Sequence, residues 1–142
     1  MKNKLIDIKE NFTVKHFTFS KGSITKFDEG RYNIEVPIEK FILDDKTIAT
    51  SLRLDFIRLP NKLETYIGEK ITFPVNPTEG YIDGSIYLRD AHNPVDVTEI
   101  HFLKIKNNTI VVEMTMNFVF DFESIGFENE ILTTRFMLDV VE

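Results

Sequence analysis

The sequence predicts an all-β fold, either an antiparallel β-sandwich or a partly closed barrel of about eight or nine strands with little helix. Apolar and polar residues alternate along several segments, which is the period of a half-buried strand. Turn-forming Gly, Pro, Asn and Asp residues separate these segments at short intervals. No helical periodicity is long enough for crossover connections, so strands that follow one another should pair antiparallel.

Length and composition predict one globular β domain over residues 1–142. The chain is 42% hydrophobic and 28% charged, which is typical of a folded protein with its own core. Its apolar runs are too short for a membrane-spanning helix, and charged residues interrupt the first twelve positions, where a secretory signal would lie. Cysteine is absent, which fits a reducing compartment. We therefore expect a cytoplasmic protein without membrane contact.

The first half of the chain predicts three strands. Residues 12–19 are rich in aromatic and β-branched residues. Residues 31–43 alternate regularly, although Pro37 cannot donate to a ladder and so indicates an edge strand or a bulge. Residues 48–59 admit a helical alternative, but their alternation favours a strand with three apolar side chains on one face, namely Leu52, Leu54 and Phe56.

The middle of the chain predicts a short helical turn and two short strands. Residues 61–68 suit a single helical turn closed by Gly68, and residues 70–75 suit a strand. Residues 81–88 alternate, with Ile82, Gly84, Ile86 and Leu88 on the apolar face. A glycine inside a strand indicates a bulge or a close approach of another backbone, which is how we interpret Gly84.

The last third predicts three strands, of which residues 109–122 are the longest. Asn107-Asn108 precedes it and suits a tight hairpin turn with a strand over residues 97–106, because Asn tolerates positive φ. Residues 131–141 predict the final strand. Six side chains of the longest strand share its inward face: Val112, Met114, Met116, Phe118, Phe120 and Phe122.

The charge distribution limits the class of partner. The net charge is −6; residues 1–26 carry +4, from six lysines and two acids, and residues 117–142 carry −5, from one arginine and six acids. Phosphate neutralisation supplies much of the affinity for nucleic acid, so an acidic protein disfavours that partner. A basic protein partner is compatible with this charge, and simple solubility is the structural explanation.

Residues 80–97 hold the densest set of groups that could do chemistry: Asp83, Asp90, His92 and Asp96. Carboxylates with one imidazole suit magnesium, manganese or iron, but this spacing matches no motif with a known mechanism. We favour a structural interpretation, in which residues 89–96 form a surface connection. In it Asn93-Pro94 makes the turn, Asp90 and Asp96 cap backbone N–H groups, and His92 is exposed.

Three functions remain open from the sequence. The one we favour is a small, acidic, non-catalytic protein-binding domain without a cofactor, for which an immunity-type or regulatory protein is one concrete form. The second is a barrel that carries an apolar small ligand, because the 13 Phe and four Met residues could line a cavity as well as a core. The third is a metal-dependent hydrolase that uses the cluster from Asp83 to Asp96. The chain contains no nucleophile elbow or phosphate-binding glycine loop, and thus no signature of an enzyme.

Overall fold

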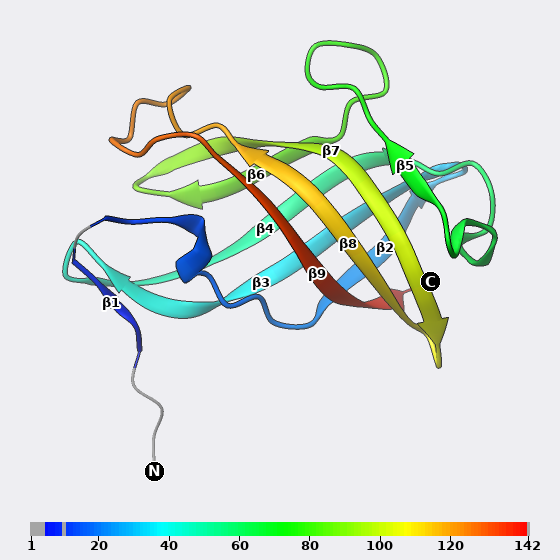
Figure 1. Cartoon of the computed structure of the whole chain (residues 1–142), viewed down its shortest axis with the longest axis horizontal. Helices are drawn as coiled ribbons and strands as arrows, with labels where there is room; N and C mark the ends of the chain where they lie inside the picture. The colour runs from blue at the N-terminus through cyan, green and yellow to red at the C-terminus, as the bar shows by residue number, and fades with distance from the viewer. Residues whose placement is uncertain (1–4, 10, 142) are drawn as a thin grey trace.

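The computed structural model describes residues 5–9 and 11–141 and forms a closed β-barrel (Figure 1). Two short 3₁₀ helices, η1 (Val14–His16) and η2 (Leu63–Tyr66), accompany the strands. The strands of the described residues are β1 (Asp7–Ile8), β2 (Gly22–Asp28), β3 (Arg31–Leu43), β4 (Lys46–Arg58), β5 (Lys70–Thr72), β6 (Asp83–Leu88), β7 (Ala91–Lys106), β8 (Thr109–Phe118) and β9 (Glu130–Val141).

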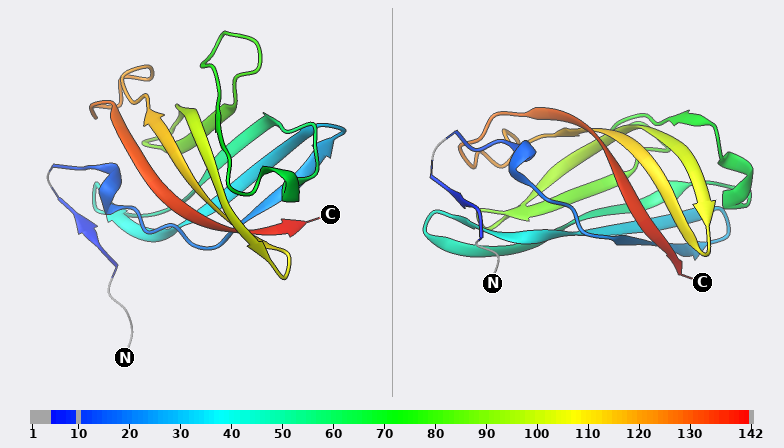
Figure 2. Two further views of the ribbon diagram at one scale, coloured as in Figure 1. Left: turned by 45° about the vertical axis from the view of Figure 1, so that its right-hand side comes forward. Right: turned by 60° about the horizontal axis from the view of Figure 1, so that its bottom comes forward.

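Seven of these strands close the ring. Hydrogen-bonded neighbours follow the order β3-β2-β9-β8-β7-β6-β4, and pairing of β3 with β4 completes it. β1 pairs with β3 and β5 with β7 outside the ring. Most pairs are antiparallel, as expected, whereas β1–β3 and β2–β9 are parallel. Figure 2 shows β7, β8 and β9 crossing over β2, β3 and β4. Of the two predicted architectures, sandwich and partly closed barrel, the barrel is therefore the one found, and its ring is closed.

Three two-residue turns join the long hairpins. Both central residues have positive φ in each: 56° and 60° at Asp44-Asp45, 51° and 60° at Arg89-Asp90, and 53° and 62° at Asn107-Asn108. Such turns match the right-handed twist of the strands that they connect. The turn predicted at Asn107-Asn108 is thus confirmed.

Apolar side chains fill the barrel. The inward face of β8 is fully buried, with Val112, Met114, Met116 and Phe118 at 0% exposure, and Phe120 just beyond the strand is also at 0%. Phe122 is 71% exposed, so its predicted inward position is wrong. The strand ends at Phe118, the Val119 N–H donates to the Pro94 carbonyl, and residues 120–124 form a turn.

The strand predicted over residues 12–19 is also wrong. Thr13 instead caps η1, and only a single bridge joins Phe19 to Ile38. The aromatic residues of this segment pack against the barrel. The Phe17 ring lies edge-on to the rings of Phe12 and Phe19, and the ring centres of Phe19 and Phe136 are 5.0 Å apart. Side-chain packing, together with a capped turn, replaces the ladder here.

β4 is a strand, as expected, but its predicted inward face contains one error. Leu52 and Leu54 are fully buried, whereas Phe56 is 38% exposed at φ 65°. Its N–H donates to the Asn33 side chain at 3.0 Å, where the register of β3 and β4 shifts. The bulge turns Phe56 outward and returns the inward position to Ile57.

Pro37 does not mark an edge strand, because β3 pairs on both sides. It lies just past Glu35, the end of the pairing with β2, and its carbonyl accepts from the Ser20 N–H. Its nitrogen therefore faces the side on which β2 has ended, and the ladder with β4 loses no donor.

Within residues 5–9 and 11–141, no helix is long and apolar enough to cross a bilayer.

Candidate functional site

The β6–β7 hairpin carries all four candidate residues, but it turns earlier than predicted. The turn is Arg89-Asp90, whereas Asn93 and Pro94 lie within β7 opposite Ile86 and Ser85. The surface connection expected over residues 89–96 is therefore wrong. A two-residue turn continues the twist of both strands, and alternation along β7 then directs Asn93 inward.

Asn93 stabilises the turn from inside. The side chain is fully buried, and its Nδ2 donates to the carbonyls of Ile86, Leu88 and Ala91 at 3.3, 3.1 and 3.0 Å. These carbonyls flank the turn, so a single amide satisfies several buried acceptors. The expected capping of backbone N–H groups by Asp90 and Asp96 is not among the side-chain hydrogen bonds of the described residues; the turn is instead stabilised by Asn93, which donates to backbone carbonyls.

The structure brings three of the four candidates into one pocket of about 380 Å³ on the outside of the barrel. We call it the acidic pocket. Asp83, His92 and Asp96 line it together with Tyr81, Ser85, Pro94, Val119 and Phe122. Asp90 lies at the hairpin turn and does not line it. No three His, Asp or Glu side chains of the described residues could hold a metal ion together, so the pocket lacks the ligand set that the hydrolase hypothesis needs.

The carboxylates of the acidic pocket are uncompensated. Neither Asp83 nor Asp96 forms an ion pair with any described residue, and Asp55 faces Asp83 across the β4–β6 ladder. Burial raises the pKa of Asp96. Burial also raises the pKa of Asp55; nearby Arg53 opposes this shift and the Asp83 charge adds to it. Partial loss of hydration therefore makes the charged forms of these carboxylates less favourable here than in water.

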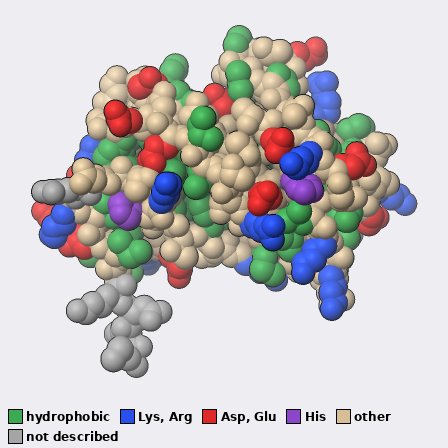
Figure 3. Space-filling view, viewed as in Figure 1, with side chains coloured by type: hydrophobic (Ala, Val, Ile, Leu, Met, Phe, Trp, Pro, Cys, Tyr) green, Lys and Arg blue, Asp and Glu red, His purple; other side chains and the backbone are tan. Residues whose placement is uncertain are grey.

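Other charged surfaces of the barrel differ from this pocket. On the face of β7, β8 and β9, acidic and basic side chains lie next to one another (Figure 3). Arg135 and Glu113 form one such pair at 3.3 Å. Asp83 and Asp96 of the acidic pocket, by contrast, form no ion pair with a described residue.

Aromatic rings border the acidic pocket. Phe122 projects from the loop after β8 with 71% of its surface exposed, and Tyr81 lies on the segment before β6. The rings of Tyr87 and His92 meet edge-on at 4.9 Å. Sequence reasoning missed Phe122 as a surface residue. The one local signal was its position between two charged residues, Asp121 and Glu123.

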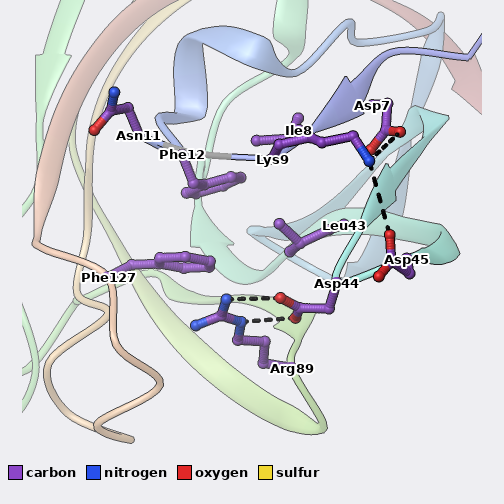
Figure 4. A pocket seen from close by; sticks show the side chains of 10 residues that line it. All are labelled: Asp7, Ile8, Lys9, Asn11, Phe12, Leu43, Asp44, Asp45, Arg89 and Phe127. Carbon is purple, nitrogen blue, oxygen red and sulfur yellow. Dashed lines mark hydrogen bonds and ion pairs between the residues drawn. The ribbon is translucent and has the colours of Figure 1, made fainter.

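A second pocket of about 340 Å³ lies at one end of the barrel (Figure 4). Its charged groups satisfy one another. Arg89 forms two hydrogen bonds of 2.9 Å with the Asp44 carboxylate, and Lys9 lies 3.2 Å from Asp7 and 3.9 Å from Asp45. The Arg89 side chain draws down the pKa of Asp44 through these hydrogen bonds. This arrangement joins parts of the fold and leaves little charge for a ligand.

An apolar carrier would need a pocket lined by the buried apolar side chains of the barrel. Five pockets formed by described residues are all partly open to solvent, and surface side chains contribute to each. The buried Met and Phe side chains of β8 line none of these five pockets. The acidic pocket is therefore the better candidate for a functional site.

Comparison of the chain with models of protein families, with curated proteins and with solved structures gives no match. A functional hypothesis therefore depends on the geometry and charge of the acidic pocket.

Proposed function

We propose that the protein is a non-catalytic binding domain that takes a basic partner protein at the acidic pocket. The observation that carries this proposal is the pair of unpaired carboxylates, Asp83 and Asp96, beside the exposed ring of Phe122. A cationic side chain of the partner would compensate the carboxylates and pack its aliphatic stem against the ring.

The energetic reason lies in desolvation. Asp96 is partly buried and unpaired, and this burial raises its pKa. A lysine or arginine from a partner adds a charge-assisted hydrogen bond at a site that has already lost part of its hydration. Aromatic residues and paired charges of this kind supply much of the binding energy in protein interfaces.

Long-range charge supports the same class of partner. The net charge of −6, concentrated in the C-terminal quarter, attracts a basic protein before contact. Such steering raises association rates and weakens as salt screens the charges over about 8 Å at physiological ionic strength. A toxin-neutralising or regulatory protein is one form that this function would take.

The test compares two double variants with the same change in charge. Asp83→Asn with Asp96→Asn removes two charges from the acidic pocket. Glu64→Gln with Glu69→Gln removes two exposed charges at and just after η2, at the opposite end of the barrel from the loop after β8 (Figure 1). The probe is a fluorescein-labelled decalysine peptide, and fluorescence anisotropy measures its affinity at low and high salt.

We expect the pocket variant to bind decalysine about tenfold more weakly, which corresponds to ~1.4 kcal/mol. The control variant should stay within about twofold, because exposed charges far from the contact contribute little. Equal losses of affinity in both variants would show that net charge alone explains the binding, which would contradict the proposal. Salt-sensitive binding of duplex DNA would contradict the class of partner.

A further inference from the structure

Arg89 joins two hairpin turns at the end of the barrel (Figure 4). It belongs to the β6–β7 turn, and its hydrogen-bond partner Asp44 belongs to the β3–β4 turn. Nε and one terminal nitrogen of the guanidinium each lie 2.9 Å from a different carboxylate oxygen. This bidentate geometry fixes the plane of the guanidinium as well as its position. We call the pair the Arg89–Asp44 latch.

The same guanidinium also holds the loop between β8 and β9. Its Nη1 donates to the Ile125 carbonyl at 2.7 Å, and its central carbon lies 4.1 Å from the centre of the Phe127 ring. Gly126, between them, has φ 95°, and a β-carbon there would lie 3.0 Å from Nη1. The loop therefore follows the surface of the guanidinium closely, in a conformation that glycine allows.

Further contacts connect this held segment to the acidic pocket. The Asp121 N–H donates to the Asn129 side chain at 2.9 Å and so ties the two arms of the loop together. Phe127 stacks on Phe12 at 4.2 Å and meets the fully buried Phe120 edge-on at 5.8 Å. Phe122 thus lies between a residue anchored in the core and a segment anchored by Arg89.

We infer that the Arg89–Asp44 latch positions Phe122 as the wall of the acidic pocket and so sets the pocket's affinity for a cationic partner. The inference rests on the proposed function of that pocket. Arg89 is a positioning residue, because it lines the second pocket, at the end of the barrel, and not the acidic pocket. When the latch is broken, the loop populates conformations without the wall, and the apparent affinity falls in proportion to the fraction of molecules that keep the wall in place.

Lysine cannot replace arginine in this role. Its ammonium keeps the charge but has neither the planar fork for Asp44 nor the flat face for Phe127, and it reaches fewer acceptors at once. Arg89→Lys therefore separates the latch from a simple effect of net charge. The matched control is Arg135→Lys, because Arg135 also pairs with a carboxylate, that of Glu113, on another face of the barrel.

The experiment uses Phe122 itself as the reporter. The chain contains no tryptophan, so Phe122→Trp introduces a single one at the wall of the acidic pocket. Steady-state anisotropy of this tryptophan reports the mobility of the loop, and titration with decalysine reports affinity in the same sample. Far-UV circular dichroism checks that each variant is folded.

We expect Arg89→Lys to lower the tryptophan anisotropy and to weaken decalysine binding by about fivefold, while Arg135→Lys changes neither. Phe127→Leu removes the stacked ring without changing the charge and should lower anisotropy and affinity in the same way. It is the second test of the inference if Arg89→Lys does not fold. Unchanged anisotropy and affinity in Arg89→Lys or Phe127→Leu would overturn the inference.

Failure of the latch can be told apart from failure of the pocket. If the Asp83 and Asp96 substitutions abolish binding but Arg89→Lys does not alter it, the latch inference is overturned and the proposed function stands. If those aspartate substitutions leave binding unchanged, the proposed function fails, and the latch inference, which rests on it, fails with it. The tryptophan anisotropy then shows only whether Arg89 orders the loop.

Discussion

Gly84 of β6 faces Val95 of β7 so closely that a β-carbon on residue 84 would lie 2.2 Å from the Val95 carbonyl oxygen. The same added β-carbon would lie 3.0 Å from the Leu54 side chain. The strand therefore contains a glycine because two backbones and a core side chain meet there, which is one of the two explanations that the sequence offered.

Gly84→Ala should lower the free energy of unfolding by about 1–3 kcal/mol, because the added methyl group meets backbone that can move only together with its ladder. Ser85→Ala, at the next position and on the outer face, should stay within about 0.5 kcal/mol. Urea denaturation followed by circular dichroism measures both. A loss for Gly84→Ala no larger than that for Ser85→Ala would show that the hairpin relaxes freely.

Phe118 and Phe122 should behave oppositely, although both belong to one alternating run in the sequence. Phe118 is fully buried, so Phe118→Ala should lower the free energy of unfolding by ~3–5 kcal/mol. Phe122 is 71% exposed, so Phe122→Ala should change stability by no more than about 0.5 kcal/mol. The second variant should nevertheless weaken decalysine binding by about threefold or more if the ring contributes to recognition. Thermal unfolding and anisotropy titration provide the two readouts, and a large stability loss at Phe122 would refute its surface position.

Asn93 and His92 are adjacent in β7 but face opposite sides of it. Asn93→Ala removes the donor to three carbonyls around the Arg89-Asp90 turn and should lower the free energy of unfolding by about 2–3 kcal/mol. His92→Ala, at an exposed position, should change it by less than about 0.5 kcal/mol. Chemical denaturation of the two variants decides the point, and equal costs would contradict the inward placement of Asn93.

Asp96 should make stability depend on pH in the direction opposite to most aspartates. Its pKa is raised in the folded protein above the ordinary aspartate value of 3.8, so folding binds a proton at pH values between the two. The contribution of Asp96 to stability is therefore fully present below pH 3.8 and is lost as pH rises through the folded pKa. Asp96→Asn should remove this loss and raise the free energy of unfolding at neutral pH, by less than about 1 kcal/mol because solvent screens a partly exposed charge. Denaturation from pH 3 to pH 7 tests it; a neutral-pH stability below wild type would show that the carboxylate has a stabilising partner.

The sequence by itself determined most of the strands and their faces. Alternation over residues 31–43, 48–59, 81–88 and 131–141 predicted strands that the structure contains, and positive φ at Asn107-Asn108 closes the expected hairpin. These features are local, because a side-chain period of two residues and the tolerance of Asn for the left-handed region do not depend on distant neighbours.

Only the tertiary structure decided where strands end, which register they adopt and which residues meet. The alternation of β8 continues through Phe120 to Phe122, yet the strand stops at Phe118. The bulge at Phe56 and the turn at Arg89-Asp90 likewise depend on the strand that lies opposite. The acidic pocket depends on β6 pairing with both β4 and β7, and on the loop after β8, which Arg89 contacts at the Ile125 carbonyl. Strand pairing carries no local signature of its partner, since each backbone donor and acceptor is satisfied equally well by any strand, and packing of the whole barrel selects one arrangement.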